Sequence, residues 1–446
     1  MAETSVVVDH KRLTAFIADA LGAMKMPRER ASVTAELMVR TDLRGVDSHG
    51  IDMLPRYHEL WQDGFVVMDA DAVLEKDSMA TALYDGAKGL GHWVSSLAMK
   101  LAIDKARTYG IGIVTARNSG HFGAAANYSM MALEHDMIGV ATTNSAFIAM
   151  VPTFGRAPKL STNPISFAAP AGRHAPFVLD MATTTVAFGK LRIASRWGKP
   201  IPSGWALDDD GEPTTDPDVA MKHRLQTPLG GTRELGSHKG YGLAVMVDIL
   251  SGILPGAVYG DLYVRTDRAE RKLQDTGHCF IAIDPARFRP LADFKRDMDD
   301  FFDSLKSTPT AEGHDRVYVA GEPEAECEAR RRREGIPLSP GLDRARGRAG
   351  PHSGPAPARL TRSRFERRLR RRNPGTKTSA APRWGVLGGA AARSPQRSLT
   401  HACSPPRAML RTANAAAAAK RTLKKASEPT QGPARSAAPK SPTLRA

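Results

Sequence analysis

Apolar residues recur at helical spacing through the N-terminal part of the chain. Between residues 13 and 21 they lie three or four positions apart, which indicates one face of an amphipathic helix. Pro27 then marks a second helix start, because proline is well tolerated in a first turn, and Gly45 marks its end. The pattern predicts two helices within residues 10–45, followed by a turn, a short helix and a connector over residues 46–75.

From about residue 80 short apolar runs alternate with longer amphipathic runs. Short apolar runs bounded by turn residues indicate strands, and longer periodic runs indicate helices. This alternation predicts an α/β domain, and it does not settle whether the strands are parallel. Strands are predicted at ATALYDG, IGIVTA, MIGVATTN, PISFAAPA, PFVLDMAT and HCFIAIDP; helices at HWVSSLAMKLAIDKARTYG, AAANYSMMALEHD, KGYGLAVMVDILSGI, FKRDMDDFFDSLKS and EAECEARRRREG; and a loop-rich stretch at 196–235.

The last quarter of the chain differs from the rest in composition and charge. Residues 341–446 contain 24 Lys and Arg against 3 Asp and Glu, a formal charge of +21. The other 340 residues carry 39 against 44, or −5, so the basic character belongs to a tail. Its Arg, Pro, Ala, Gly and Ser content is typical of disorder. Nucleic acid is therefore not expected as a partner, except through this tail.

Cysteine usage and hydropathy indicate the cellular setting. Cys279, Cys327 and Cys403 are scattered without ligand-like spacing, which argues against a disulfide framework and against a metal site. No apolar run reaches about 18 residues, so no membrane span is expected. The N-terminus lacks a basic region followed by an apolar core, so no secretion signal is expected. These features predict a cytoplasmic protein.

One turn carries residues that suit chemistry. Ser48 and His49 follow a predicted helix end, and Arg44 lies a few residues upstream. An imidazole titrates near neutral pH and is a natural acid or base, while a guanidinium suits a carboxylate. The same spacing also fits a capped turn with a solvated histidine, and the sequence leaves both interpretations open.

A second candidate is the glycine-flanked His121 in NSGHFGAAANY, between a predicted strand and a predicted helix. The small residues Gly123, Ala124 and Ala125 would let a ligand approach the backbone closely. A helix start presents free N–H groups that suit phosphate or carboxylate. The alternative is a glycine-rich turn with a solvent-facing histidine.

Three further segments combine polar residues with predicted strand or helix ends. Thr162 precedes Asn163 and a proline, and VLDMATT at 178–184 ends a strand in an acid followed by small residues. His238 and Lys239 begin an apolar helix, where positive charge is mildly unfavourable. Each segment also fits a strand cap, a helix cap or solvated surface. The sequence contains no GxGxxG after a strand, no GxxxxGK[ST], no HExxH and no GxSxG.

Taken together, these segments resemble the malate/L-lactate dehydrogenase family, which is unrelated to the Rossmann-type lactate dehydrogenases. The matching pieces follow the family's order over residues 10–340. The pairing of SHGIDMLPRY with AFGKLRIA looks most like the hydroxycarboxylate dehydrogenase branch. The pieces are DLRGVDSHGIDMLPRY, NSGHFGAAANYS, TNPISFAAP, LDMATTTVAFGK, GEPTTDP, HKGYGLAVMVDILSG, FIAIDP and GEPEAECEARRRREGIPL.

The resemblance implies a non-Rossmann NAD(P)-binding α/β fold and a homodimer with its site in a cleft between domains. It implies an N-terminal helical domain at residues 1–78 and an NAD(P)-binding domain at 79–285. C-terminal helices at 286–340 would return to the N-terminal domain, and a disordered basic tail would occupy 341–446. Whether this tail is genuine or the product of a shifted reading frame is left open.

The resemblance also implies residue roles in hydride transfer between NAD or NADP and a small 2-hydroxy acid. His121, His49 and Ser48 would be catalytic, and Arg44 and Thr162 would bind the substrate. No metal is expected. Cofactor contacts would come from His49, Gly123, Ala124, Ala125, Val178, Leu179, Asp180, Met181, Ala182, His238, Lys239, Gly277, Gly321, Glu322, Pro323 and Glu324.

Three positions depart from the family pattern. Met53 stands where some relatives have a second arginine, Lys190 where some have a relay aspartate, and Ser161 where a glycine is usual. Two other functions therefore stay open at this point. One is an imine reductase acting on a cyclic amino acid. The other is an inactive scaffold whose basic tail binds nucleic acid.

Overall fold

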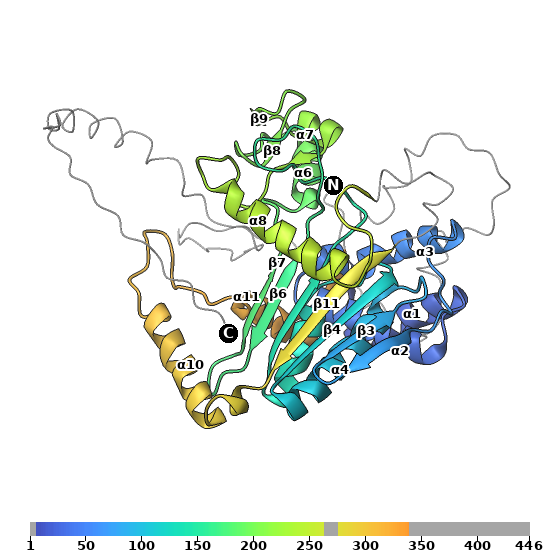
Figure 1. Cartoon of the computed structure of the whole chain (residues 1–446). Coiled ribbons are helices and arrows are strands. Elements are labelled where there is room, and N and C mark those ends of the chain that lie inside the picture. The colour runs from blue at the N-terminus through green and yellow to red at the C-terminus, as the bar shows by residue number, and fades with distance from the viewer. Residues whose placement is uncertain (1–5, 263–274, 339–446) are drawn as a thin grey trace, which may run out of the picture. The chain divides into compact units, whose positions relative to one another are not determined.

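A seven-stranded mixed sheet forms the centre of the computed structural model, which describes residues 6–262 and 275–338 (Figure 1). The neighbours β3 and β4 run parallel, and every other neighbouring pair in this sheet is antiparallel. In spatial order the strands are β2 (Val73–Ser78), β3 (Thr81–Asp85), β4 (Ile111–Ser119), β11 (Thr276–Ile283), β5 (Ile138–Thr143), β6 (Ile165–Ala169) and β7 (Phe177–Met181).

The mixed α/β architecture and all six predicted strands are confirmed. The edge strand β2 was missed, because its sequence VLEKDS is polar and every one of its residues is exposed. The strand β11 inserts between β4 and β5, although it lies far from both in the sequence. Hydropathy patterns report which residues are buried, not which strands pair, so this order could not be read from the sequence.

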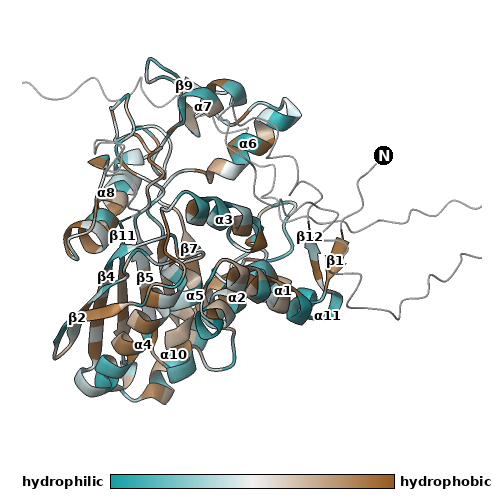
Figure 2. Cartoon of the chain, turned by 90° about the vertical axis from the view of Figure 1, so that its right-hand side faces the viewer, coloured by the Kyte–Doolittle hydropathy of each residue, from teal (hydrophilic) through white to brown (hydrophobic). Residues whose placement is uncertain are grey.

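Helices cover one face of the sheet, as Figure 2 shows for α4 (Gly91–Tyr109) and α5 (Ala126–Ser129). Buried side chains of α4, such as Ala98 and Met99, pack against Val114 of β4 and Phe280 of β11. The predicted helix AAANYSMMALEHD is only one α-helical turn that continues as the 3-10 segment η3 (Met130–His135). The apolar face of these helices therefore provides the main core.

The N-terminal helices α1 (His10–Ala23) and α2 (Arg28–Leu43) are confirmed. After α2 the chain makes two 3-10 turns, η1 (Asp47–His49) and η2 (Ile51–Met53), before α3 (Leu54–Gln62).

The C-terminal segment returns to these helices. The helix α11 (Glu322–Glu334) contacts α2, and β12 (Ile336–Leu338) pairs with β1 (Val6–Val8). The C-terminal segment therefore packs beside the helix α2, which leads into the turn at Asp47–His49.

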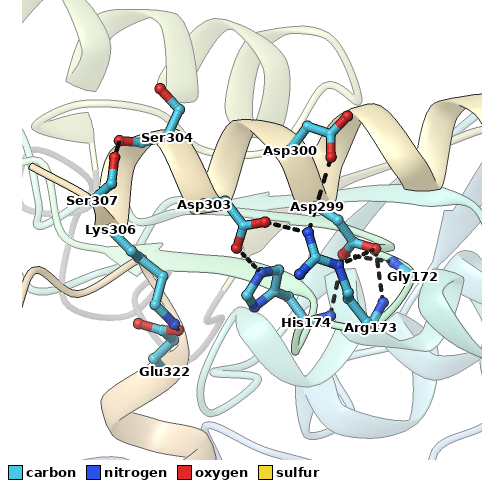
Figure 3. Close-up of polar contacts among 10 residues, drawn as sticks. All are labelled: Gly172, Arg173, His174, Asp299, Asp300, Asp303, Ser304, Lys306, Ser307 and Glu322. Carbon is cyan, nitrogen blue, oxygen red and sulfur yellow. Dashed lines mark hydrogen bonds and ion pairs between the residues drawn. The ribbon is translucent and has the colours of Figure 1, made fainter.

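The helix α10 (Leu291–Lys306) packs elsewhere, against the turn between β6 and β7 (Figure 3). The Asp299 carboxylate accepts hydrogen bonds from the backbone N–H groups of Gly172, Arg173 and His174, at 3.1, 2.8 and 3.1 Å. Of the two predicted C-terminal helices, α11 contacts the N-terminal helix α2, whereas α10 contacts the turn between β6 and β7. The predicted domain boundaries stay predictions.

The stretch 196–235, predicted to be loop-rich, contains regular structure. It holds α7 (Pro217–His223) and a small sheet of β10 (Leu225–Gln226), β8 (Ala206–Leu207) and β9 (Pro213–Thr214), preceded by α6 (Phe188–Trp197). These strands are two residues long, too short to produce a hydropathy pattern. The apolar helix predicted at 239–253 is α8 (Ser237–Asp248), continued by the π-helical turn η4 (Ile249–Ile253).

The described residues contain neither a membrane-spanning helix nor a group of metal-ligating side chains. Across residues 6–262 and 275–338, no helix is long and apolar enough to cross a membrane, and no group of three metal-ligating side chains occurs. Cys279 and Cys327 are buried free thiols. Cys403 and the predicted tail at 341–446 lie outside the described residues.

The contact of α4 with β4 predicts the effect of one glycine substitution. A Cβ added at Gly112 would lie 2.1 Å from the carbonyl oxygen of Ala102. We expect Gly112→Ala to lower the free energy of unfolding by about 1–3 kcal/mol or more, because helix and strand must separate. Chemical denaturation measures this. The control is Gly22→Ala in α1, where an added Cβ meets no atom within 4 Å. This substitution should raise the free energy of unfolding by up to about 1 kcal/mol. Equal stabilities of the two variants would contradict the packing described.

Candidate active site

Two predicted site histidines from distant parts of the chain face each other. His49 ends the 3-10 turn η1, and His121 follows β4. Their ring centroids lie 5.6 Å apart, with the ring planes tilted by 30°. Both side chains are half-buried, so each keeps access to solvent. The sheet therefore presents one imidazole, and the N-terminal helices present the other.

The environment keeps His49 uncharged. Its Nδ1 lies 2.8 Å from the Ser48 hydroxyl, and burial lowers the pKa of its imidazole. A neutral imidazole has one free lone pair and is able to accept a proton. The predicted pairing of Ser48 with His49 thus exists as a hydrogen bond.

His121 is held on one side by two partners. The backbone N–H of Gly123 donates to its Nδ1 at 3.3 Å, and the Tyr57 hydroxyl lies 2.8 Å from the same atom. Desolvation, reinforced by the neighbouring imidazoles of His49, His92 and His278, lowers the pKa of His121 well below its usual value. His121 is therefore neutral at pH 7, with its Nδ1 engaged.

Tyr57 is a site residue that the sequence did not reveal. It belongs to α3, is fully buried, and its hydroxyl contacts His121, while its ring meets His92 edge-on at 5.6 Å. Helical spacing places Tyr57 on the same buried face as Leu60, which predicts burial and not a polar partner. Only the packing of α3 beside the loop after β4 brings the two groups together.

Two further histidines lie buried behind His121. His92 of α4 is fully buried, and neither ring nitrogen has a hydrogen-bond partner within the described parts of the chain. His278 of β11 lies between the hydroxyls of Thr143 and Ser119, at 2.7 and 2.9 Å. Burial lowers the pKa of each to about 3, so both are neutral. Nothing in the sequence singled out either residue.

Three predicted cofactor segments converge near this pair. The Ala126 N–H, directly after Gly123–Ala125, donates to the Asp180 carboxylate at 2.9 Å. The Val178 N–H donates to the Ala320 carbonyl at 3.0 Å. A Cβ at Gly321 would lie 2.8 Å from that of Val178, so only glycine allows this approach. The start of α5 thus meets the last residues of β7, and the start of α11 meets the first residues of the same strand.

Charged groups on this surface are closely balanced. Asp180 is exposed at the surface, yet the surrounding protein desolvates its carboxyl and raises its pKa to about 6. Arg44 and Glu324 influence the same carboxyl with opposite signs. The Glu322 carboxylate pairs with Lys306 at 2.5 Å (Figure 3), and it accepts the Val319 N–H at 2.9 Å. The Glu322 side chain is therefore already engaged within the protein.

Arg44 occupies a different setting from the one predicted. Its side chain is only 8% exposed, and its guanidinium lies 3.5 Å from the Glu328 carboxylate of α11. It thus joins the N-terminal helices to α11 instead of standing free.

The remaining predicted residues have other contacts. The Thr162 carbonyl accepts hydrogen bonds from Thr183, His238 contacts Arg233 at 3.1 Å, and Lys239 begins α8 beside it. A Cβ at Gly277 would lie 1.6 Å from the Ser251 carbonyl oxygen, which accounts for this glycine by packing alone.

Burial of His92 predicts how stability depends on pH. The folded-state pKa of about 3 lies below the unfolded value of about 6.5, so unfolding takes up a proton below pH 6.5. Between pH 7 and pH 5 the wild type should lose about 2 kcal/mol more unfolding free energy than His92→Phe, as measured by urea titration. The exposed His135→Phe serves as the control and should follow the wild type. Identical pH dependence in His92→Phe would show that His92 is solvated.

Comparison with known proteins shows the family of the chain. A family model described as malate/L-lactate dehydrogenase matches residues 8–344. The chain is similar to malate dehydrogenase of Pyrococcus horikoshii, with 41% identity over 337 residues, 75% of this chain and 92% of that protein. Hydroxycarboxylate dehydrogenase B of Escherichia coli is 31% identical over 339 residues, 75% of this chain and 90% of that protein.

A solved structure supports the same assignment. Sulfolactate dehydrogenase from Methanocaldococcus jannaschii superposes with a TM-score of 0.69 at 38% identity, covering 76% of this chain and 94% of that one. The family model, the sequence relatives and the fold all agree. The chain therefore belongs to the malate/L-lactate dehydrogenase family and is an oxidoreductase that acts on the CH–OH group of 2-hydroxy acids.

Proposed function

We propose that this enzyme transfers a hydride between NAD(P) and a small 2-hydroxy acid of the malate or sulfolactate type. The observation that carries the proposal is the pair of neutral imidazoles, His49 and His121, whose centroids lie 5.6 Å apart. Oxidising an alcohol requires a group that takes the hydroxyl proton, and a neutral imidazole serves this role at neutral pH. When bound, the nicotinamide accepts or returns the hydride.

We assign different roles to the two histidines, and their hydrogen bonds support the assignment. The Gly123 N–H points at Nδ1 of His121, so this nitrogen is an acceptor and Nε2 carries the proton. His121 then donates a hydrogen bond to the substrate oxygen. In this assignment His49 donates from Nδ1–H to the Ser48 hydroxyl, 2.8 Å away, which leaves its Nε2 free to accept a proton. His49 is therefore the proton acceptor in oxidation.

The substrate's acid group requires a cation and a polar neighbour. Arg44 remains our candidate for the carboxylate, and Thr162 for a second substrate oxygen. Binding to Arg44 would replace its 3.5 Å contact with Glu328, a long contact that is weaker than a close ion pair. Malate and sulfolactate carry two acid groups. Since Met53 is not a cation, the second acid group would have to be bound by another residue.

Identity values favour one branch of the family. The chain is 41% identical to a malate dehydrogenase and 31% identical to hydroxycarboxylate dehydrogenase B. The branch expected from SHGIDMLPRY and AFGKLRIA is therefore not supported. We place this enzyme with the malate and sulfolactate dehydrogenases.

The residues present fit a dinucleotide. Gly123 and Gly321 have φ of +79° and +96°, and both lie where polypeptide segments approach each other closely. Gly321 packs against Val178 of β7, and Ala126, three residues after Gly123, donates its N–H to Asp180 of the same strand. A titration with NADH and NADPH distinguishes the two cofactors. The predicted contacts at His238, Lys239 and Gly277 stay part of this proposal.

The uncovered face of the sheet supports the predicted homodimer. On this face the half-buried residues Leu179, Phe167, Val140, Ile281 and Ile113 form one apolar row across five paired strands. Figure 1 looks onto these strands, with α8 at their upper ends. A continuous apolar row on a sheet marks a contact surface. A second copy of the chain would bury it.

Substitutions by glutamine test the two histidine roles. An amide N–H still donates to an oxygen, but an amide does not accept a proton at neutral pH. We expect His49→Gln to lower kcat for oxidation about 100-fold or more. The loss of kcat in His121→Gln should be at least about ten times smaller than the loss in His49→Gln. Steady-state kinetics with malate, sulfolactate and a cyclic imine provide the measurement. Near-normal rates in both variants would remove the site assignment. Turnover with the imine alone would support an imine reductase instead.

The lowered pKa values predict the pH profile of the wild type. Because burial lowers the pKa values of both imidazoles below 6.5, the acidic decline of the oxidation rate should have its midpoint below pH 6.5. The rate of reduction should rise over the same acidic range, since it consumes a proton. An acidic midpoint of kcat/KM above pH 6.5 would contradict the burial of these groups.

A charge on the apolar row tests the homodimer. Val140→Lys would bury an unpaired ammonium in the interface, so we expect a monomer in sedimentation velocity at micromolar concentration. The control is Thr108→Lys on the exposed end of α4, which should sediment as the wild type does. A wild-type monomer, or a dimer that persists in Val140→Lys, would exclude this surface as the interface.

A further inference from the structure

A carboxyl group that the proposed chemistry does not use lies beneath the turn carrying Ser48 and His49. Asp42 is near the end of α2 and only 1% exposed. Its Oδ2 accepts the backbone N–H of Ile51 at 2.9 Å. A Cβ added at Gly50 would lie 1.8 Å from its Oδ1, so the carboxyl packs flush against the backbone next to His49.

The other side of the same turn is held by α11. The guanidinium of Arg331 donates to the Asp42 carbonyl and to both carboxylate oxygens of Asp47, one of them at 3.2 Å. The turn Asp47–His49 contains no buried residue, so packing alone does not fix it. Asp42 from inside and Arg331 from outside thus supply its polar anchors.

We propose that Asp42 is a positioning residue for His49, acting through its hydrogen bond to Ile51 and its contact with Gly50. This rests on the proposed role of His49. Asp42 does not touch the substrate. It sets where the imidazole lies relative to His121, and a misplaced acceptor loses rate steeply.

The charge state of Asp42 gives the proposal a pH signature. Burial, with the neighbouring carboxylates Asp47 and Asp52, raises the pKa of Asp42 to about 8, against the opposing effects of Ile51 and Arg331. The folded state therefore keeps a proton that the unfolded state releases near pH 4. Stability falls as pH rises from about 4 through 8, and ionisation above pH 8 sets Asp42 against Asp47 and Asp52 under the turn.

Two substitutions separate the hydrogen bond from the charge. Asp42→Asn keeps an acceptor for Ile51 and cannot ionise, whereas Asp42→Ala removes the acceptor. In Asp42→Ala we expect hydrogen exchange of the Ile51 amide to rise about tenfold and kcat to fall about tenfold or more. In Asp42→Asn both should stay within about threefold of wild type at pH 7. The control is Asp248→Asn, a buried carboxyl remote in sequence, which should leave Ile51 exchange unchanged.

The pH profile of Asp42→Asn tests the positioning role of Asp42 even if Asp42→Ala does not fold. The wild type should lose kcat and Tm between pH 7 and pH 9, and Asp42→Asn should lose less of both, with a Tm difference of about 3 °C or more at pH 9. Equal alkaline losses would overturn the proposal. So would an Asp42→Ala enzyme with normal kcat despite fast Ile51 exchange. Failure of the His49 role itself is separate, since it appears as normal activity in His49→Gln with Ile51 exchange unaffected.

Discussion

The structure depends on keeping imidazoles uncharged where the N-terminal helices meet the sheet. His49, His121, His92 and His278 come from four different elements, and burial lowers the pKa of every one. A charge on any of them would be poorly solvated and would further disfavour a charge on the others. Burial at this junction therefore yields bases that are ready at neutral pH, and makes the fold sensitive to acid.

Much of the surrounding architecture serves this junction. His121 follows the sheet strand β4, His278 belongs to β11, and His92 belongs to α4. The helix α3 adds Tyr57, which contacts both His121 and His92. The turn with His49 is fixed by α2 and by α11, which comes from the far end of the described chain. Residues distant in sequence thus set how the two imidazoles lie relative to each other, and so how both would meet one substrate oxygen.

The sequence predicted the helices and most strands, because periodic apolar positions report burial directly. It also singled out His49, His121 and Ser48 as candidates, because histidine and serine among glycines stand out from packing residues. The structure brings the three together, and their catalytic roles stay predictions. It did not predict Tyr57, His92 or His278, since each lies in a segment that reads as ordinary core. For Arg44 the sequence suggested the residue type needed for substrate binding but not its ion-pair partner. Its residue type suggested a free cation, whereas its partner Glu328 lies 284 positions away and could only be found in three dimensions.

One measurement addresses the central claim, that His49 and His121 act on the same substrate oxygen. It is a double-mutant cycle on kcat/KM for oxidation with His49→Ala, His121→Ala and the combined variant. Groups that act as a unit show strong non-additivity, so the double variant should be little worse than the more damaged single one. Losses that simply multiply would mean that the two imidazoles work independently, and would contradict this account.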